Sequence, residues 1–127
     1  MTPIRRRVLE ALHASPKPMG AYELADVLAP RGHRIAPMTV YRALDFLIDQ
    51  GLAHRLASLN AYIAGQPGST ADKASAFLIC EGCGSVNEIT SPEVAETVMG
   101  ILTEQGFKSR AKVLEITGRC TQCNEVH

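Results

Sequence analysis

Residues 37–51 read PMTVYRALDFLIDQG, and this stretch has the clearest helical pattern in the chain. Pro37 suits a first helical turn and Gly51 suits a helix end, so we expect a helix between them. Its apolar side chains recur every three or four residues, so they line one face that must pack against a core. These side chains are Val40, Ala43, Leu44, Leu47 and Ile48.

The segments on either side of this helix predict two more helices and a hairpin. Two short apolar segments, residues 52–57 and 61–63, follow it and predict a β-hairpin. Before it, Thr2-Pro3 predicts the start of a helix that ends at residues 15–18, and residues 21–29 predict a second helix. Three helices followed by a hairpin is the order of a winged helix-turn-helix. A small helical bundle with an ordinary solvated face fits the same order.

The outer face of the third helix carries residues suited to DNA, namely Thr39, Tyr41 and Arg42. An arginine can hydrogen-bond to O6 and N7 of guanine together, and a tyrosine can bind phosphate or pack on sugar. We therefore expect Arg42 to read a base and Tyr41 to position the helix. The arginines of the first helix, Arg5–Arg7, could contact phosphates, although three consecutive helical positions cannot all face the same way.

A stretch without large apolar residues separates two halves of the chain. Residues 65–75 read GQPGSTADKAS, a composition typical of a linker. We therefore expect a DNA-binding domain at residues 1–64 and a second domain at residues 76–127. The formal net charge is zero, but residues 1–65 carry eight basic and five acidic groups, and the remainder carries five and eight. The basic half is the better candidate for a polyanionic partner.

All four cysteines lie in the second half, in two Cys-x-x-Cys pairs: Cys80 with Cys83, and Cys120 with Cys123. Zinc takes four ligands in a tetrahedron, and each pair supplies two thiolates from one tight turn. Two disulfides or a redox motif are the alternatives, but a cytosolic chain disfavours the first and the second needs only one pair. We expect one structural zinc per chain. The turns would be allowed by Gly82, Gly84 and Gly118.

Between the cysteine pairs the pattern predicts one small α/β unit. Residues 76–80 and 86–89 predict strands, Ser91-Pro92-Glu93 predicts a helix start, and residues 107–116 predict a last strand. The basic residues of that last strand would alternate outward: Lys108, Arg110 and Lys112. A three-stranded sheet with one helix is too small to bury both faces. We therefore expect an α+β homodimer that presents two recognition helices to a palindromic DNA site.

Composition excludes several other classes of protein. The chain has 127 residues and 46% hydrophobic residues, as in a globular protein. No apolar run is long enough to cross a membrane, and the N-terminus lacks the apolar segment of a secretory signal, so we expect a cytoplasmic protein. No phosphate-binding glycine loop or catalytic Cys-His signature occurs, so we do not expect an enzyme.

Five stretches together resemble a known family: TPIRRRVLEAL, AYELADVL, TVYRALDFLIDQGLAHRL, FLICEGCGSVNEI and LEITGRCTQC. They resemble the ferric-uptake-regulator (Fur) superfamily, most of all its zinc-uptake-regulator (Zur) branch, in family order over nearly the whole chain. The resemblance implies a bacterial metal-responsive repressor with a winged-helix domain, a hinge and a dimerisation domain that carries the structural zinc. It also implies DNA contacts by Tyr22, Tyr41 and Arg42, and a second, regulatory zinc near the hinge.

The sequence departs from the family pattern at that second metal site. Members of the zinc branch usually draw its ligands from four places, of which His54 and Glu88 are matched here. Where the family has a cysteine after the hairpin, this chain has Ala64-Gly65, and where it has a hinge histidine, this chain has Asp72-Lys73-Ala74. No cysteine or histidine occurs from residue 55 to residue 79.

Several interpretations of this depleted site are open. His54 and Glu88 could bind metal weakly, with help from Asp72, His33, His127 or water. The protein could be a family member that senses no metal or another signal, or it could have a rearranged site. His54 could be a packed core residue and Glu88 an exposed strand residue. Outside the DNA-binding class, the alternative is a zinc-stabilised protein-interaction module.

Overall fold

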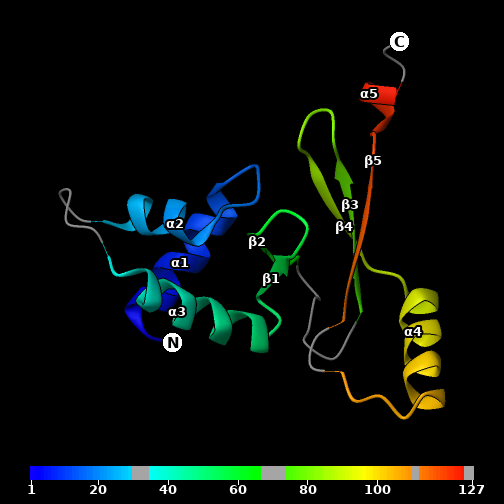
Figure 1. The fold of residues 1–127 in the computed structure, drawn as a ribbon. Helices are drawn as coiled ribbons and strands as arrows, with labels where there is room; N and C mark the ends of the chain where they lie inside the picture. Colours follow the sequence, from blue (N-terminus) through cyan, green and yellow to red (C-terminus); the bar gives the residue numbers. More distant parts are fainter. Residues whose placement is uncertain (30–34, 67–73, 110–111, 125–127) are drawn as a thin grey trace. The chain divides into compact units, whose positions relative to one another are not determined.

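The structure is a computed structural model that describes residues 1–29, 35–66, 74–109 and 112–124. The chain groups into two units, Met1–Pro67 and Gly68–His127, and the division falls inside the stretch 65–75. In the described residues, the first unit contains three helices and a hairpin, and the second contains a three-stranded sheet with two helices (Figure 1).

Three helices begin the first unit: α1 (Pro3–Ala14), α2 (Ala21–Leu28) and α3 (Pro37–Asp49). Thr2 caps α1, because its hydroxyl oxygen accepts a hydrogen bond of 3.4 Å from the backbone N–H of Arg5. Pro37 occupies the first turn of α3. After this helix Gly51 adopts a φ of 74°, which glycine tolerates best. The predicted start and stop signals therefore operate in this unit.

One apolar core holds the first unit together. The predicted stripe on α3 is buried except for Ile48, which is partly buried, and Val40, Leu44 and Leu47 have 0% of their surface exposed. They belong to one cluster with Val8 of α1 and Leu24 of α2. Burying an apolar side chain of this size contributes about 1.5–3 kcal/mol. The cluster therefore fixes which face of α3 remains available to a partner.

The hairpin of the first unit consists of β1 (Ala53–Leu56) and β2 (Ala61–Ala64), which pair antiparallel. The loop between them turns at Asn60, whose φ of 48° lies in the left-handed region that asparagine tolerates. Met19, between α1 and α2, pairs with Tyr62 of β2 through backbone hydrogen bonds of 2.9 and 2.7 Å. This bridge ties the hairpin to the chain between the first two helices.

The second unit is built on a sheet with the strand order β4-β3-β5. The central strand β3 (Ser75–Cys80) pairs antiparallel with β4 (Val86–Ile89) and parallel with β5 (Val113–Gly118). The parallel pair ends with Cys80 opposite Gly118, so both strands lead to the cysteine pairs at the same end of the sheet.

Helix α4 (Pro92–Glu104) joins β4 to β5, and its predicted cap is present, because Ser91 accepts a backbone N–H bond from the first turn. The predicted strand at residues 107–116 was wrong in its bounds. Phe107 closes the helix end instead, because its N–H donates to the carbonyl of Leu102 at 2.9 Å. Its side chain is 65% exposed and has no place in a sheet.

The last strand begins only where it finds a partner. Pairing starts with Val113 opposite Ser75, so Lys108 and Lys112 precede β5 and the predicted outward alternation of basic residues was wrong. Arg110 lies outside the described residues. A short helix, α5 (Thr121–Asn124), follows β5, and the sequence pattern did not predict it.

The two faces of this sheet differ in exposure. Phe77 and Ile79 of β3 are buried, with 0% and 5% of their surface exposed. On the other face the register places Leu78 beside Ile116, and these side chains are 43% and 57% exposed. Leu114 is also exposed on that face. The described part of the chain therefore leaves one apolar face of this sheet exposed.

Candidate metal centre and nucleic-acid interface

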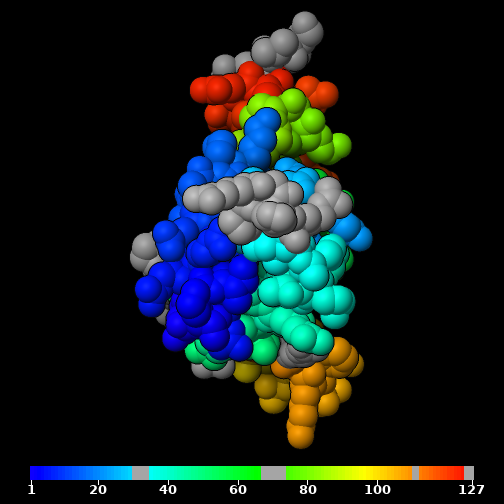
Figure 2. All heavy atoms as spheres, turned by 90° about the vertical axis from the view of Figure 1, so that its left-hand side faces the viewer, coloured from blue at the N-terminus to red at the C-terminus, as the bar shows by residue number. Residues whose placement is uncertain are grey.

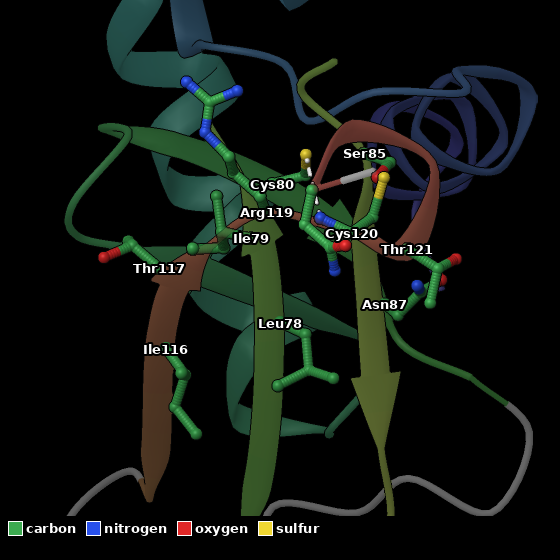
Figure 3. Close-up of a pocket in the computed structure, with 12 residues that line it drawn as sticks. Leu78, Ile79, Cys80, Ser85, Asn87, Ile116, Thr117, Arg119, Cys120 and Thr121 are labelled. Atoms are coloured by element: carbon green, nitrogen blue, oxygen red, sulfur yellow. Dashed lines mark hydrogen bonds between the residues drawn. The ribbon is translucent and has the colours of Figure 1, made fainter. Parts of the chain in front are cut away.

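The four cysteine sulfurs meet at the end of the parallel strand pair. Their Sγ atoms all lie within 4.8 Å of one another. The Sγ atoms of Cys83 and Cys120 are 3.8 Å apart, close to the separation of about 3.8 Å that two sulfurs have on a tetrahedral zinc with bonds of about 2.3 Å. Figure 3 shows Cys80, the last residue of β3, close to Cys120, which follows β5. The donor set fits one zinc ion.

Backbone N–H groups surround the sulfur of Cys80. Cys120 and Gly82 donate to it at 3.3 Å each, and Cys83 donates at 3.5 Å. These bonds, above all the one from Cys120, lower the pKa of Cys80 to about 6. The hydroxyl of Ser85 lies 3.2 Å from the sulfur of Cys83 and is the main cause of a lowered pKa there. Both cysteines are therefore prepared to bind metal as thiolates.

In the metal-free cluster the pKa of Cys123 is shifted in the opposite direction. Hydrogen bonding with the thiol of Cys120, and then with Cys80, raises the pKa of Cys123 to about 12. Neighbouring sulfurs cannot all ionise without a cation, because like charges at this separation repel. A divalent cation removes that conflict, so zinc binding at these four residues must release protons.

The glycines near the cysteine pairs have different roles. Gly84 adopts a φ of 77°, which favours glycine. At Gly82 a Cβ atom would lie 2.8 Å from the sulfur of Cys123, so this turn has no room for a side chain. Gly118 is the last residue of β5 and a Cβ there would meet nothing within 4 Å. The predicted turn role of Gly118 was therefore wrong.

The outer face of α3 changes in charge along its length. Thr39 and Arg42 are exposed, and their spacing of three places them on the same side of the first two turns. Asp45 and Asp49 are exposed further along. The first turn holds no acidic residue, and the helix dipole gives this end a partial positive charge. The beginning of α3 is therefore the part suited to a polyanion, and it lies beside α1 on the surface in Figure 2.

The two tyrosines predicted at the DNA interface differ in exposure. Tyr22 of α2 is 63% exposed, so most of its surface is available to a partner. Tyr41 of α3 is half-buried and packs against the apolar core. Its ring therefore supports the helix from the side that Thr39 and Arg42 do not occupy.

The arginines of α1 point in different directions, as their spacing requires. The guanidinium of Arg5 lies 3.8 Å from the centre of the Phe46 ring, a cation–π contact that ties α1 to α3. Arg7 donates to the carbonyl of Leu28 in α2. Arg6 is exposed. Arg5 therefore has a packing role, which the sequence did not reveal, beside its predicted contact with phosphate.

The two residues that match the family's second metal site lie in different units. His54 of β1 and Glu88 of β4 are each 7% exposed. The hydroxyl of Ser75 donates to Oε2 of Glu88 at 3.1 Å, so the interpretation of Glu88 as an exposed strand residue was wrong. The other proposed helpers, His33, Asp72 and His127, lie outside the described residues.

Fold and site together define a winged-helix protein with a four-thiolate zinc centre. Among the residues that the structure describes, none of the helices is long and apolar enough to span a bilayer. Residues 1–117 match the model of the ferric uptake regulator family. The chain belongs to this family.

The chain is similar in sequence to zinc uptake regulators. It is 36% identical over 126 residues to the zinc uptake regulation protein of Escherichia coli (strain K12), a match that covers 99% of this chain and 74% of that protein. It is 32% identical over 103 residues to the zinc uptake regulation protein of Mycobacterium tuberculosis (strain H37Rv), covering 81% of this chain and 78% of that protein.

Two solved structures share the fold over nearly the whole chain. The crystal structure of holo XcZur has a TM-score of 0.83 and 38% sequence identity, covering 98% of this chain and 86% of that one. A zinc uptake regulator complexed with zinc and DNA has a TM-score of 0.85 and 36% identity, covering 98% of this chain and 83% of that one. The matches include both the helix–hairpin unit and the unit that carries the cysteine cluster.

Proposed function

We propose that this chain is a zinc-dependent transcriptional repressor of the zinc-uptake type, which binds palindromic DNA as a homodimer. The observation that carries the proposal is the exposed pair Thr39 and Arg42 on the positive end of α3. The likeness to a zinc uptake regulator solved with zinc and DNA supports it. Such a protein acts in the cytoplasm and is a regulator rather than an enzyme.

DNA recognition follows from the chemistry of that helix end. The guanidinium of Arg42 suits the O6 and N7 acceptors of guanine in the major groove. Thr39, one turn earlier on the same side, suits a thymine methyl or a phosphate. Tyr22 and Arg5 would contact the DNA backbone, which sets the position of the helix without reading sequence. The acidic residues Asp45 and Asp49 favour an approach by the first turns only.

The uncovered apolar face of the second unit supports a homodimer. A hollow of about 380 Å³ lies between the cysteine cluster and the exposed side chains of Leu78 and Ile116 (Figure 3). A second copy of the chain would remove this surface from water, which favours association. A two-fold dimer would then present two copies of α3 to the two halves of a palindrome.

Zinc would serve this assembly through the fold of the second unit. Bound by Cys80, Cys83, Cys120 and Cys123, it would join the ends of β3 and β5 to the two turns that follow them. The four thiolates leave zinc with no open coordination position, so its role is structural rather than catalytic.

The proposal is tested by comparing two variants that each remove one positive charge. Arg42→Ala removes the proposed base contact, and Lys17→Ala removes an exposed charge between α1 and α2. Duplexes selected by the zinc-loaded chain from a random pool are measured by fluorescence anisotropy, beside scrambled duplexes. We expect Arg42→Ala to cost about 1–3 kcal/mol on the selected duplex, which is roughly a 5- to 150-fold rise in Kd.

The control separates base reading from general attraction to phosphate. Lys17→Ala should weaken binding to the selected duplex and to the scrambled duplex by the same small factor. If Arg42→Ala binds both duplexes as well as the original chain does, Arg42 does not read DNA. If the zinc-loaded chain binds no duplex at low salt, where phosphate contacts are strongest, the interaction module becomes the better account.

A further inference from the structure

Backbone atoms leave no room for a side chain at Gly65, the residue that follows the hairpin. Gly65 donates its N–H to the carbonyl of Leu52 at 2.8 Å. A Cβ atom at Gly65 would lie 2.8 Å from the carbonyl oxygen of Gly51 and 3.3 Å from that of Leu52. Both atoms belong to the backbone just after α3, where Gly51 has a φ of 74°. A side chain at residue 65 could enter only if the end of α3 or the hairpin shifted.

This closure lies directly against the imidazole of His54. The Nε2 atom of His54 is 3.2 Å from the place of a Cβ atom at Gly65. The imidazole is 7% exposed and stands on β1 opposite Ile63 of β2. A cysteine at residue 65, beside His54, would therefore press its Cβ atom against the carbonyl oxygens of Gly51 and Leu52. The neighbour Ala64 offers no ligand atom and pairs with Ala53 in the hairpin.

Glu88, the other residue that matches the family's second metal site, is held by neighbours in the second unit. Glu88 lies opposite Phe77 of β3, which has 0% of its surface exposed. Its Oε2 atom accepts the hydrogen bond of 3.1 Å from Ser75 Oγ, and Ser75 is 3% exposed. A buried carboxylate needs such partners. In the described residues, the cysteine cluster is the one group of three or more potential ligands close enough to hold a metal ion.

We propose that His54 and Glu88 are structural residues in this chain, and that zinc controls DNA binding through the four-cysteine cluster alone. This inference rests on the proposed function and specifies its regulation. Zinc at the cluster stabilises the unit that carries the dimer face, and a dimer binds two half-sites with far higher affinity than one subunit does. DNA affinity should therefore follow the occupancy of one metal site per chain.

The test titrates the metal-free full chain with Co²⁺, which reports four-thiolate coordination by its visible absorption. Operator affinity is followed by anisotropy in the same titration, and native mass spectrometry counts the metal ions per chain. We expect absorption and DNA binding to saturate together at one metal per chain. A second equivalent should change the Kd for DNA by less than about twofold. His54→Gln and Glu88→Gln should give the same metal count and the same coupling.

Opposite outcomes are equally clear. A second metal ion that tightens DNA binding tenfold or more, and that is lost in His54→Gln or Glu88→Gln, would overturn the inference. If a buried substitution prevents folding, the metal count of the original chain still decides between one site and two. If the chain binds one metal but no DNA, the proposed function fails while the assignment of a single metal site stands.

Discussion

Gly82 passes so close to Cys123 that replacing it with alanine should loosen the metal centre. The new Cβ atom would lie 2.8 Å from Cys123 Sγ and 3.0 Å from Cys123 Cβ. Ordinary van der Waals contacts begin near 3.4 Å, so the sulfur or the turn must move by about 0.6 Å. Ligand distances in a well-formed zinc site lie within about 0.2 Å of their usual values. We therefore expect this movement to weaken the bond between zinc and Cys123.

We expect Gly82→Ala to lower the zinc affinity by about one to two orders of magnitude. Changes beside metal ligands typically weaken binding by about 10- to 100-fold, which corresponds to about 1.4–2.7 kcal/mol. Competition between the protein and a colorimetric chelator at neutral pH measures the difference. Gly118→Ala is the matched control, because a Cβ atom there meets nothing within 4 Å. If Gly82→Ala and Gly118→Ala hold zinc equally well, the steric reasoning is refuted.

Two further predictions concern the dimer face and the thiols. Ile116→Glu puts a carboxylate in the exposed apolar face of the sheet, so it should be a monomer in sedimentation velocity and should bind the operator at least tenfold more weakly. The control variant Gln105→Glu adds the same charge at an exposed position after α4 and should remain dimeric. A dimeric Ile116→Glu would show that this face is not the interface. Zinc affinity should fall as the pH is lowered, because protons compete with zinc for the thiolates. The fall should be steeper below about pH 6, where the thiolate of Cys80, whose pKa is lowered to about 6, also becomes protonated in the metal-free protein. Chelator competition at several pH values checks this, and a pH-independent affinity would contradict it.

Local signals predicted much of the fold because they act within a few residues. Proline and a capping hydroxyl mark the starts of α1 and α4, and the apolar spacing of α3 matches its buried face. The strand before α4 and the hairpin were also predicted nearly at their observed bounds. In each case the deciding interaction joins residues three or four apart, or alternating positions of one strand.

Features that depend on distant partners were predicted wrongly or missed. The strand predicted from Phe107 begins only at Val113, because a strand needs a neighbour and pairing with β3 starts there. The bridge between Met19 and Tyr62 joins segments far apart in sequence. The cation–π contact of Arg5 with Phe46 is likewise invisible to helical periodicity.

The candidate sites show the same division. The spacing of the cysteines predicted a cluster, because two Cys-x-x-Cys turns leave zinc few other arrangements. The burial of Glu88 beside Ser75 could not be predicted, since alternation along a strand of four residues does not say which face is covered. The closure at Gly65 depends on the backbone of Gly51, fourteen positions earlier in the numbering.

Sequence-selective DNA binding by the zinc-loaded chain is the most direct test of this account. Anisotropy should be measured on a selected palindromic duplex and on a scrambled one, between about 50 and 200 mM salt. We expect one dimer per palindrome, a clear preference for the selected duplex, and an affinity that falls steeply with salt. Equal affinity for both duplexes, or no binding at the lowest salt, would contradict the assignment of α3 as a recognition helix.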